Sequence, residues 1–83
     1  MATKIFQVTT LIEECDGNNA YAEPFLNEQD AEDYFDNEVA YLKKEYEVDD
    51  DDVHITYVDE NNKTCNMYAQ DWYITIQFQT FSK

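Results

Sequence analysis

Residues 27–46, NEQDAEDYFDNEVAYLKKEY, carry the clearest structural pattern in the chain. Apolar side chains recur there at intervals of three and four residues, the spacing of one face of an α-helix. They are Ala31, Phe35, Val39, Leu42 and Tyr46. Asn27 is a favourable N-cap, and the acidic first turn and the lysines of the last turn both suit the helix dipole. The pattern predicts an amphipathic helix from about Glu28 to Tyr46 that packs on a sheet.

The segments on either side of this helix are rich in β-branched and aromatic residues, which favours strands. The expected strands are Lys4–Glu13, Ala20–Phe25, Val53–Asp59, Thr64–Ala69 and Trp72–Phe81. The first has apolar side chains on both faces, with Phe6, Val8, Thr10 and Ile12 on one of them, so it is predicted to be central. Pro24 lacks a ladder donor and predicts that the second strand lies at an edge.

Turn signals separate these strands. Residues 16–19, Asp-Gly-Asn-Asn, favour a tight turn because they tolerate positive φ. Residues 60–63 and 70–71 are predicted to be further breaks. The element order β-β-α-β-β(-β) predicts an α+β fold, in which one amphipathic helix packs on an antiparallel sheet of four to five strands. The length of 83 residues allows one domain, residues 1–83.

Charge sets the chain apart from an ordinary small domain. Nineteen acidic residues against five lysines give a formal net charge of -14. Charge of one sign at this density repels itself, attracts basic surfaces and opposes binding to nucleic acid or to anionic membranes. The aromatic content of 16% excludes a disordered acidic tail, because such segments are poor in aromatic residues.

The cellular location is expected to be the cytoplasm. The start of the chain lacks a signal-peptide pattern, and no apolar stretch approaches the ~18 residues of a membrane span. The two cysteines, Cys15 and Cys65, are too few for a disulfide framework. Each is expected to be a small buried hydrophobe, and a disulfide between them is expected only in a secreted protein.

Residue constellations typical of catalysis are missing, so the sequence predicts a protein that is not an enzyme and that uses no cofactor. His54 is the single histidine and has no nucleophile close in sequence. Gly17 is the single glycine, which excludes a glycine-rich phosphate loop. The run Asp49–Asp52 resembles the opening of a calcium loop, but His54 stands where such a loop needs glycine. A solvated acidic loop without a metal is therefore expected.

The unbalanced acids indicate a surface that binds a basic partner. The acids of the predicted helix lack the lysines that would pair with them at i,i+4. The residues expected to bind a target are Glu32, Asp33, Asp36, Asp49, Asp50, Asp51, Asp52 and Tyr41. In size, acidity and aromatic content, with Tyr21, Tyr41 and Tyr57 as expected exposed tyrosines, the chain resembles the small phage-encoded anti-restriction and anti-CRISPR proteins. The resemblance implies a DNA mimic that blocks a nuclease groove in the host cytoplasm.

A second interpretation remains open. The chain is then a generic protein-interaction domain with an incidental acidic surface, in which tyrosines carry the binding. The first interpretation expects a basic nucleic-acid-binding protein as partner, and neither expects direct contact with nucleic acid or membrane. Self-repulsion favours a monomer, and an exposed sheet edge near Pro24 or Phe81 leaves a dimer as the alternative.

Overall fold

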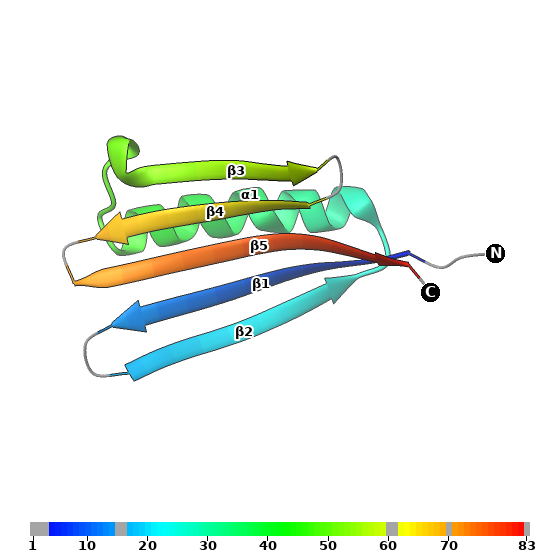
Figure 1. Cartoon of the computed structure of the whole chain (residues 1–83), viewed down its shortest axis with the longest axis horizontal. Coiled ribbons are helices and arrows are strands. Elements are labelled where there is room, and N and C mark those ends of the chain that lie inside the picture. Colours follow the sequence, from blue (N-terminus) through cyan, green and yellow to red (C-terminus); the bar gives the residue numbers. More distant parts are fainter. Residues whose placement is uncertain (1–3, 15–16, 60–61, 70, 83) are drawn as a thin grey trace.

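One helix lies across one face of a five-stranded antiparallel sheet in the computed structural model, which describes residues 4–14, 17–59, 62–69 and 71–82 (Figure 1). The elements are β1 (Lys4–Glu14), β2 (Gly17–Phe25), α1 (Glu28–Glu45), the 3-10 turn η1 (Asp50–Asp52), β3 (Val53–Asp59), β4 (Asn62–Ala69) and β5 (Trp72–Ser82). The strand order in the sheet is β2-β1-β5-β4-β3. The α+β class and the succession β-β-α-β-β-β agree with the sequence prediction.

The last strand inserts into the middle of the sheet. β5 pairs with β1 along its whole length, from Lys4 opposite Ser82 to Glu14 opposite Trp72, and with β4 on its other side. The central position predicted for β1 and the edge position predicted for β2 are confirmed. The edge predicted near Phe81 is wrong, because β5 is flanked on both sides and the second edge is β3.

The first hairpin is longer than the turn signals indicated. β2 begins at Gly17, and Asn18 and Asn19 pair with Glu13 and Ile12 instead of forming the turn. Asp16, the first residue of the predicted turn, lies outside the described residues. The longer ladder carries β2 to the end of β1.

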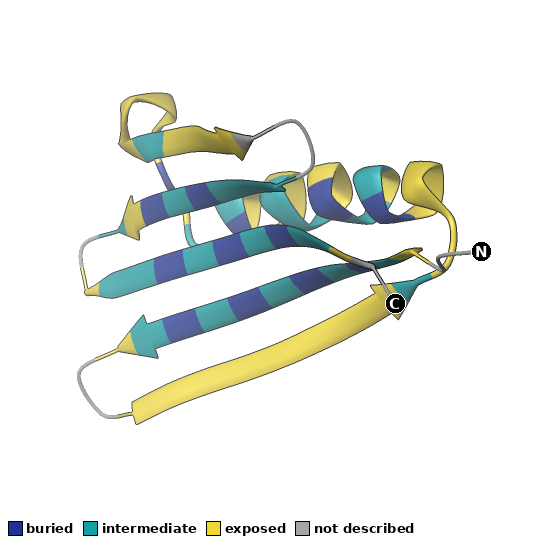
Figure 2. Ribbon diagram, turned by 45° about the vertical axis from the view of Figure 1, so that its right-hand side comes forward, coloured by how far each residue is buried: buried dark blue, intermediate teal, exposed yellow. Residues whose placement is uncertain are grey.

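The core fills the space between α1 and the sheet, where alternate strand residues are buried (Figure 2). Its members are Phe6, Val8, Ile12, Ala31, Phe35, Leu42, Val48, Cys65, Met67, Ile74, Ile76 and Phe78. Phe35 meets Phe78 edge to face, with ring centroids 6.2 Å apart. Full burial of one such large apolar side chain contributes about 1.5–3 kcal/mol, so this layer supplies the main favourable term in folding.

Both ends of α1 are capped. The Asn27 side chain accepts hydrogen bonds from the backbone of Gln29 and Asp30, which confirms the predicted N-cap. At the other end, the Val48 amide donates to the Lys43 carbonyl at 2.9 Å and the Glu47 amide to the Lys44 carbonyl at 3.3 Å. These two bonds form a Schellman motif, which ends the helix at Glu45 and makes Tyr46 its C-cap.

Candidate functional site

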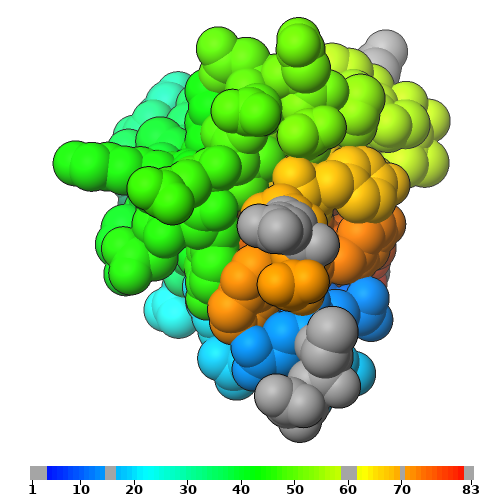
Figure 3. Space-filling model, turned by 90° about the vertical axis from the view of Figure 1, so that its left-hand side faces the viewer, coloured from blue at the N-terminus to red at the C-terminus, as the bar shows by residue number. Residues whose placement is uncertain are grey.

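One end of the molecule gathers acidic side chains from separate segments. There β1 and β4 finish, β3 and β5 begin, and α1 reaches its C-terminus (Figure 1). The acidic end consists of the exposed residues Glu14, Glu47, Asp49, Asp50, Asp51, Asp52 and Asp71. Viewed onto this end, the segments that contribute them lie side by side on one surface (Figure 3). The chain positions are far apart, so the sheet order brings these acids together.

Aromatic and apolar contacts fix the acidic end to the core. Tyr46 packs on Trp72 with ring centroids 4.6 Å apart, and Val48 between α1 and η1 is buried. The run Asp49–Asp52 is exposed as predicted, but its last three residues form the 3-10 turn η1 with Asp49 as the N-cap, and the Asp52 amide donates to the Asp49 carbonyl at 2.9 Å. Lys43 of the last helical turn forms an ion pair with Asp50.

Glu47 occupies a left-handed backbone conformation, with φ at 53°. This is the residue after the C-cap of the Schellman motif, where glycine is most common because it has no Cβ penalty. A non-glycine residue there costs about 1–2 kcal/mol. The chain therefore retains an exposed carboxylate at the acidic end despite a local conformational cost.

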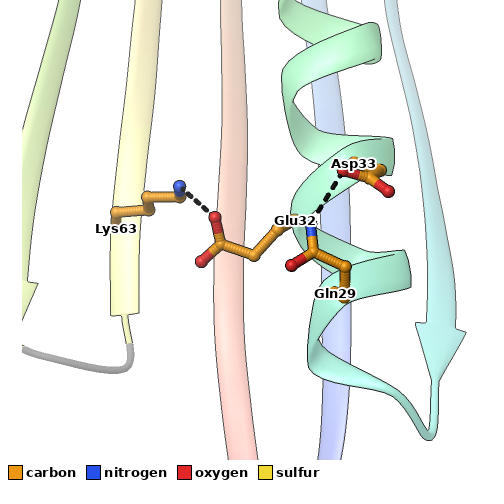
Figure 4. A network of polar contacts seen from close by, with 4 residues as sticks. All are labelled: Gln29, Glu32, Asp33 and Lys63. Carbon is orange, nitrogen blue, oxygen red and sulfur yellow. Dashed lines mark hydrogen bonds and ion pairs between the residues drawn. The ribbon is translucent and has the colours of Figure 1, made fainter.

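The predicted helix acids lie apart from the acidic end. Glu32 extends toward β4, where its carboxylate lies 3.3 Å from the Lys63 ammonium, and Asp33 accepts a 3.0 Å hydrogen bond from Gln29 (Figure 4). Asp36 is exposed on α1. The rise of ~1.5 Å per residue places Asp33 about 18 Å along the axis from the end of α1. The acidic end thus includes the predicted Asp49–Asp52, while Glu32 is charge-paired within the fold.

Tyr41 lies on a different flank of α1. It follows Asp36 by five residues, which is about 140° around the helix, and the residue is 61% exposed. A cavity of about 210 Å³ opens beside it and is lined by Tyr34, Asn37, Glu38 and Tyr41. Tyr34, Glu38 and Tyr41 share one flank through spacings of four and three residues, a signal in the sequence that the predicted site did not use.

A carboxylate and two phenols interact beside this cavity. The Tyr21 hydroxyl of β2 donates to Glu38 Oε1 at 2.9 Å. Burial, reinforced by the hydrogen bond and the charge of Glu38, raises the pKa of Tyr21 to about 12. The pKa of Tyr34 is also raised, first by burial and then by a side-chain hydrogen bond to Glu38. Both phenols therefore stay protonated at neutral pH, so Glu38 acts as their acceptor.

The face of the sheet opposite α1 has a different character. Its described side chains on the three inner strands are Ile5, Gln7, Thr9, Leu11, Glu13, Thr64, Asn66, Tyr68, Tyr73, Thr75, Gln77, Gln79 and Phe81. Glu13 is the one acid among them. His54 of β3 contacts Tyr68 with ring centroids 6.0 Å apart. The acids therefore concentrate on the helix side and at the acidic end.

The described part of the chain contains no group of three His, Cys, Asp or Glu side chains arranged to hold a metal ion. Within the same residues, no helix has the length and apolar character needed to cross a membrane. Comparison of the chain with protein-family models, with curated proteins and with solved structures found no match.

Proposed function

We propose that the protein is an inhibitor that occupies a basic nucleic-acid-binding groove on a nuclease or another DNA-binding protein. The acidic end is the surface that contacts the groove. The observation that carries the proposal is the gathering of exposed acids at one end of a capped, well-packed fold. An incidental acidic surface is expected to scatter its carboxylates. Here the described side chains of the three inner strands place one acid, Glu13, on the open sheet face, and the other acids concentrate on the helix side and at the acidic end.

Electrostatics favours such an encounter. Duplex DNA presents about one negative charge per 1.7 Å of axis, and proteins that bind it line their grooves with lysine and arginine. The C-terminus of α1 points its partial negative charge toward the acidic end, which adds to the field of the carboxylates. A directed field of one sign raises the rate of association with a surface of opposite charge.

The proposal is tested by capture from a host lysate at low and high salt, with duplex DNA as competitor. A partner that is retained at low salt, released at high salt and displaced by DNA is the expected result. In the variant that combines Asp49→Asn, Asp51→Asn and Asp52→Asn, most of this binding should be lost.

A second triple variant serves as the matched control. Glu32→Gln, Asp33→Asn and Asp36→Asn also remove three charges, but Glu32 already pairs with Lys63, so a smaller loss is expected. If the variant at the acidic end binds as well as the wild type, the proposal is wrong. A partner that ignores both salt and DNA would also contradict it.

A second candidate function is a protein-interaction module that uses the β3 edge. Ile55, Tyr57 and Val58 of this edge strand are 46%, 72% and 69% exposed. The segment Val53–Val58 has no acidic or basic residue other than His54. An uncharged, exposed edge can accept a strand from another protein. Binding that survives high salt and is abolished by Tyr57→Ser would favour this function over groove occupation.

A further inference from the structure

We infer that the cavity lined by Tyr34, Asn37, Glu38 and Tyr41 is a binding site for a guanidinium group, supplied by an arginine side chain of the partner. The cavity itself is independent of the acidic end. The assignment of the arginine to a partner protein rests on the proposed function, because arginine is abundant in grooves that hold nucleic acid.

The lining of the cavity matches the chemistry of an organic cation. Two of its four lining residues are tyrosines, and a third is a glutamate. A guanidinium within ~6 Å of an aromatic centroid is attracted by the negative face of the ring. The glutamate supplies the full negative charge that the rings lack, and the Asn37 amide oxygen can accept a further hydrogen bond.

Glu38 has acceptor capacity left for such a group. A carboxylate offers roughly four acceptor sites, and two phenols, Tyr21 and Tyr34, interact with this one. The ion pairs among the described residues join Lys43 to Asp50 and Lys63 to Glu32, so Glu38 takes part in neither. Its negative charge is therefore stabilised by neutral donors and is not cancelled by a cation of the fold.

The charges around the cavity also favour a cation. On the same flank of α1, Asp30 precedes Tyr34 by four residues, and Glu45 follows Tyr41 by four. Glu23 of β2 acts electrostatically on Tyr34 and raises its pKa. Lys43 and Lys44 are the nearest basic residues in the chain sequence, two and three positions after Tyr41. Lys43 is paired with Asp50, and Lys44 is exposed. The local field is negative overall.

Part of the site is held in place before any ligand arrives. The Tyr34 ring packs on Phe25 with centroids 5.3 Å apart, which ties one wall to β2. The Tyr21 hydroxyl orients the Glu38 carboxylate from the same strand. Tyr41, on the other side of Glu38 along the helix, is exposed and lines the cavity. Sites on regular elements bind more precisely than sites on loops.

The geometry favours a guanidinium over an ammonium. A guanidinium is planar, can stack on a tyrosine ring and can present two parallel N–H groups to one carboxylate. An ammonium is a strongly hydrated point charge and gains less from aromatic walls. We therefore expect arginine to bind more tightly than lysine.

The test is an NMR titration of the isotopically labelled protein with N-acetyl-arginine methylamide, and separately with the lysine analogue, at physiological ionic strength. The expected result is saturable shifts at Tyr34, Glu38 and Tyr41, with a Kd in the millimolar range for arginine and weaker binding for lysine. In Glu38→Gln the arginine affinity should fall about tenfold, as expected for loss of a charge-assisted bidentate contact.

Asp36→Asn is the matched control, because it removes the same charge from a different flank of α1 and should leave the Kd within about twofold. A Tyr41→Leu variant, which keeps an apolar wall without the ring, should weaken arginine binding without affecting the core. Equal losses in Glu38→Gln and Asp36→Asn, or shifts spread evenly over all acidic residues, would overturn the inference. Equal affinities for arginine and lysine would overturn the guanidinium assignment.

The result separates this site from the proposed function. If arginine fails to bind the cavity while a DNA-displaced partner is still captured through the acidic end, the inference is wrong and the inhibitor proposal stands. If arginine binds as expected and no basic partner is captured, the cavity is a guanidinium site and the proposed source of the arginine is wrong.

Discussion

Lys63 of β4 lies with its ammonium nitrogen 3.3 Å from the Glu32 carboxylate and 4.5 Å from the centroid of the Phe35 ring. The lysine side chain is 14% exposed, while the glutamate is 39% exposed. One cation thus bridges the helix and the sheet through an ion pair and an aromatic face. Because the lysine is the more buried partner, the fold depends on Glu32 to balance its charge.

Glu32→Gln should therefore destabilise the protein more than loss of an ordinary surface charge. Removal of one partner leaves the other charge partly buried without compensation, and we expect a loss of about 1 kcal/mol in the free energy of unfolding. Asp36→Asn, on an exposed position of the same helix, should change stability by less than about 0.5 kcal/mol. Urea unfolding measures both, and equal effects would contradict the bridging role of Lys63.

Among the residues that the structure describes, Thr10 is the one buried polar residue, with no exposed surface. Thr10 lies opposite Tyr21 in the sheet, and the Thr10 hydroxyl acts to lower the pKa of Tyr21. Nevertheless, no described residue forms a hydrogen bond of good geometry with the Thr10 oxygen. Thr10→Val replaces this hydroxyl with a methyl group of similar shape and should stabilise the fold by about 1 kcal/mol. Thermal unfolding provides the measurement, and a lower Tm would show that the hydroxyl is satisfied.

The local parts of the fold were predictable from the sequence, because their signals lie within one segment. The helix, for example, was placed to within one residue, since Asn27 and the apolar spacing both act over a few turns. Alternation along the sequence placed Phe6 and Val8 on the same face of β1, and both residues are buried. Pro24 identified its edge strand through the missing donor.

The non-local features escaped sequence reasoning. The insertion of β5 between β1 and β4 depends on pairings between the two ends of the chain, which no local pattern encodes. The gathering of Glu14 with Asp71 follows from that insertion, so the acidic end was only partly foreseen. The pairing of Glu32 with Lys63 and the cavity beside Tyr41 depend on which flank of α1 faces which strand.

Cys65 is a free thiol with no exposed surface in the middle of β4, and burial raises its pKa. The thiolate is the reactive form, so both access and ionisation oppose modification. In a Cys15→Ser variant, which isolates this thiol, we expect a thiol reagent to label Cys65 only as fast as the protein opens. Labelling should accelerate by orders of magnitude in urea. Fast labelling in buffer would show that the β4 region opens readily.

The raised pKa of the Tyr21 phenol makes the stability of the fold depend on pH in the alkaline range. Its pKa is raised from 10.0 to about 12 in the fold, so the protonated form stabilises the protein below pH 10. This contribution is lost as the pH rises from about 10 to about 12. In Glu38→Gln the pKa of Tyr21 should fall toward 10, while burial keeps it above that value. The chemical shift of the Tyr21 Cζ carbon against pH measures it, with Asp36→Asn as a control that should cause no change.

Glu47 offers a direct test of whether the acidic end carries a stability cost. At its φ of 53°, Glu47→Gly removes the Cβ penalty and should stabilise the fold by about 0.5–1 kcal/mol, or about 3–6 °C in Tm. Glu47→Ala removes the same charge but keeps the penalty, so its Tm should stay close to that of the wild type. Equal gains in the two variants would assign the effect to relief of charge repulsion. If the acidic end binds a basic groove, both variants should lose partner affinity equally while only the glycine variant gains stability.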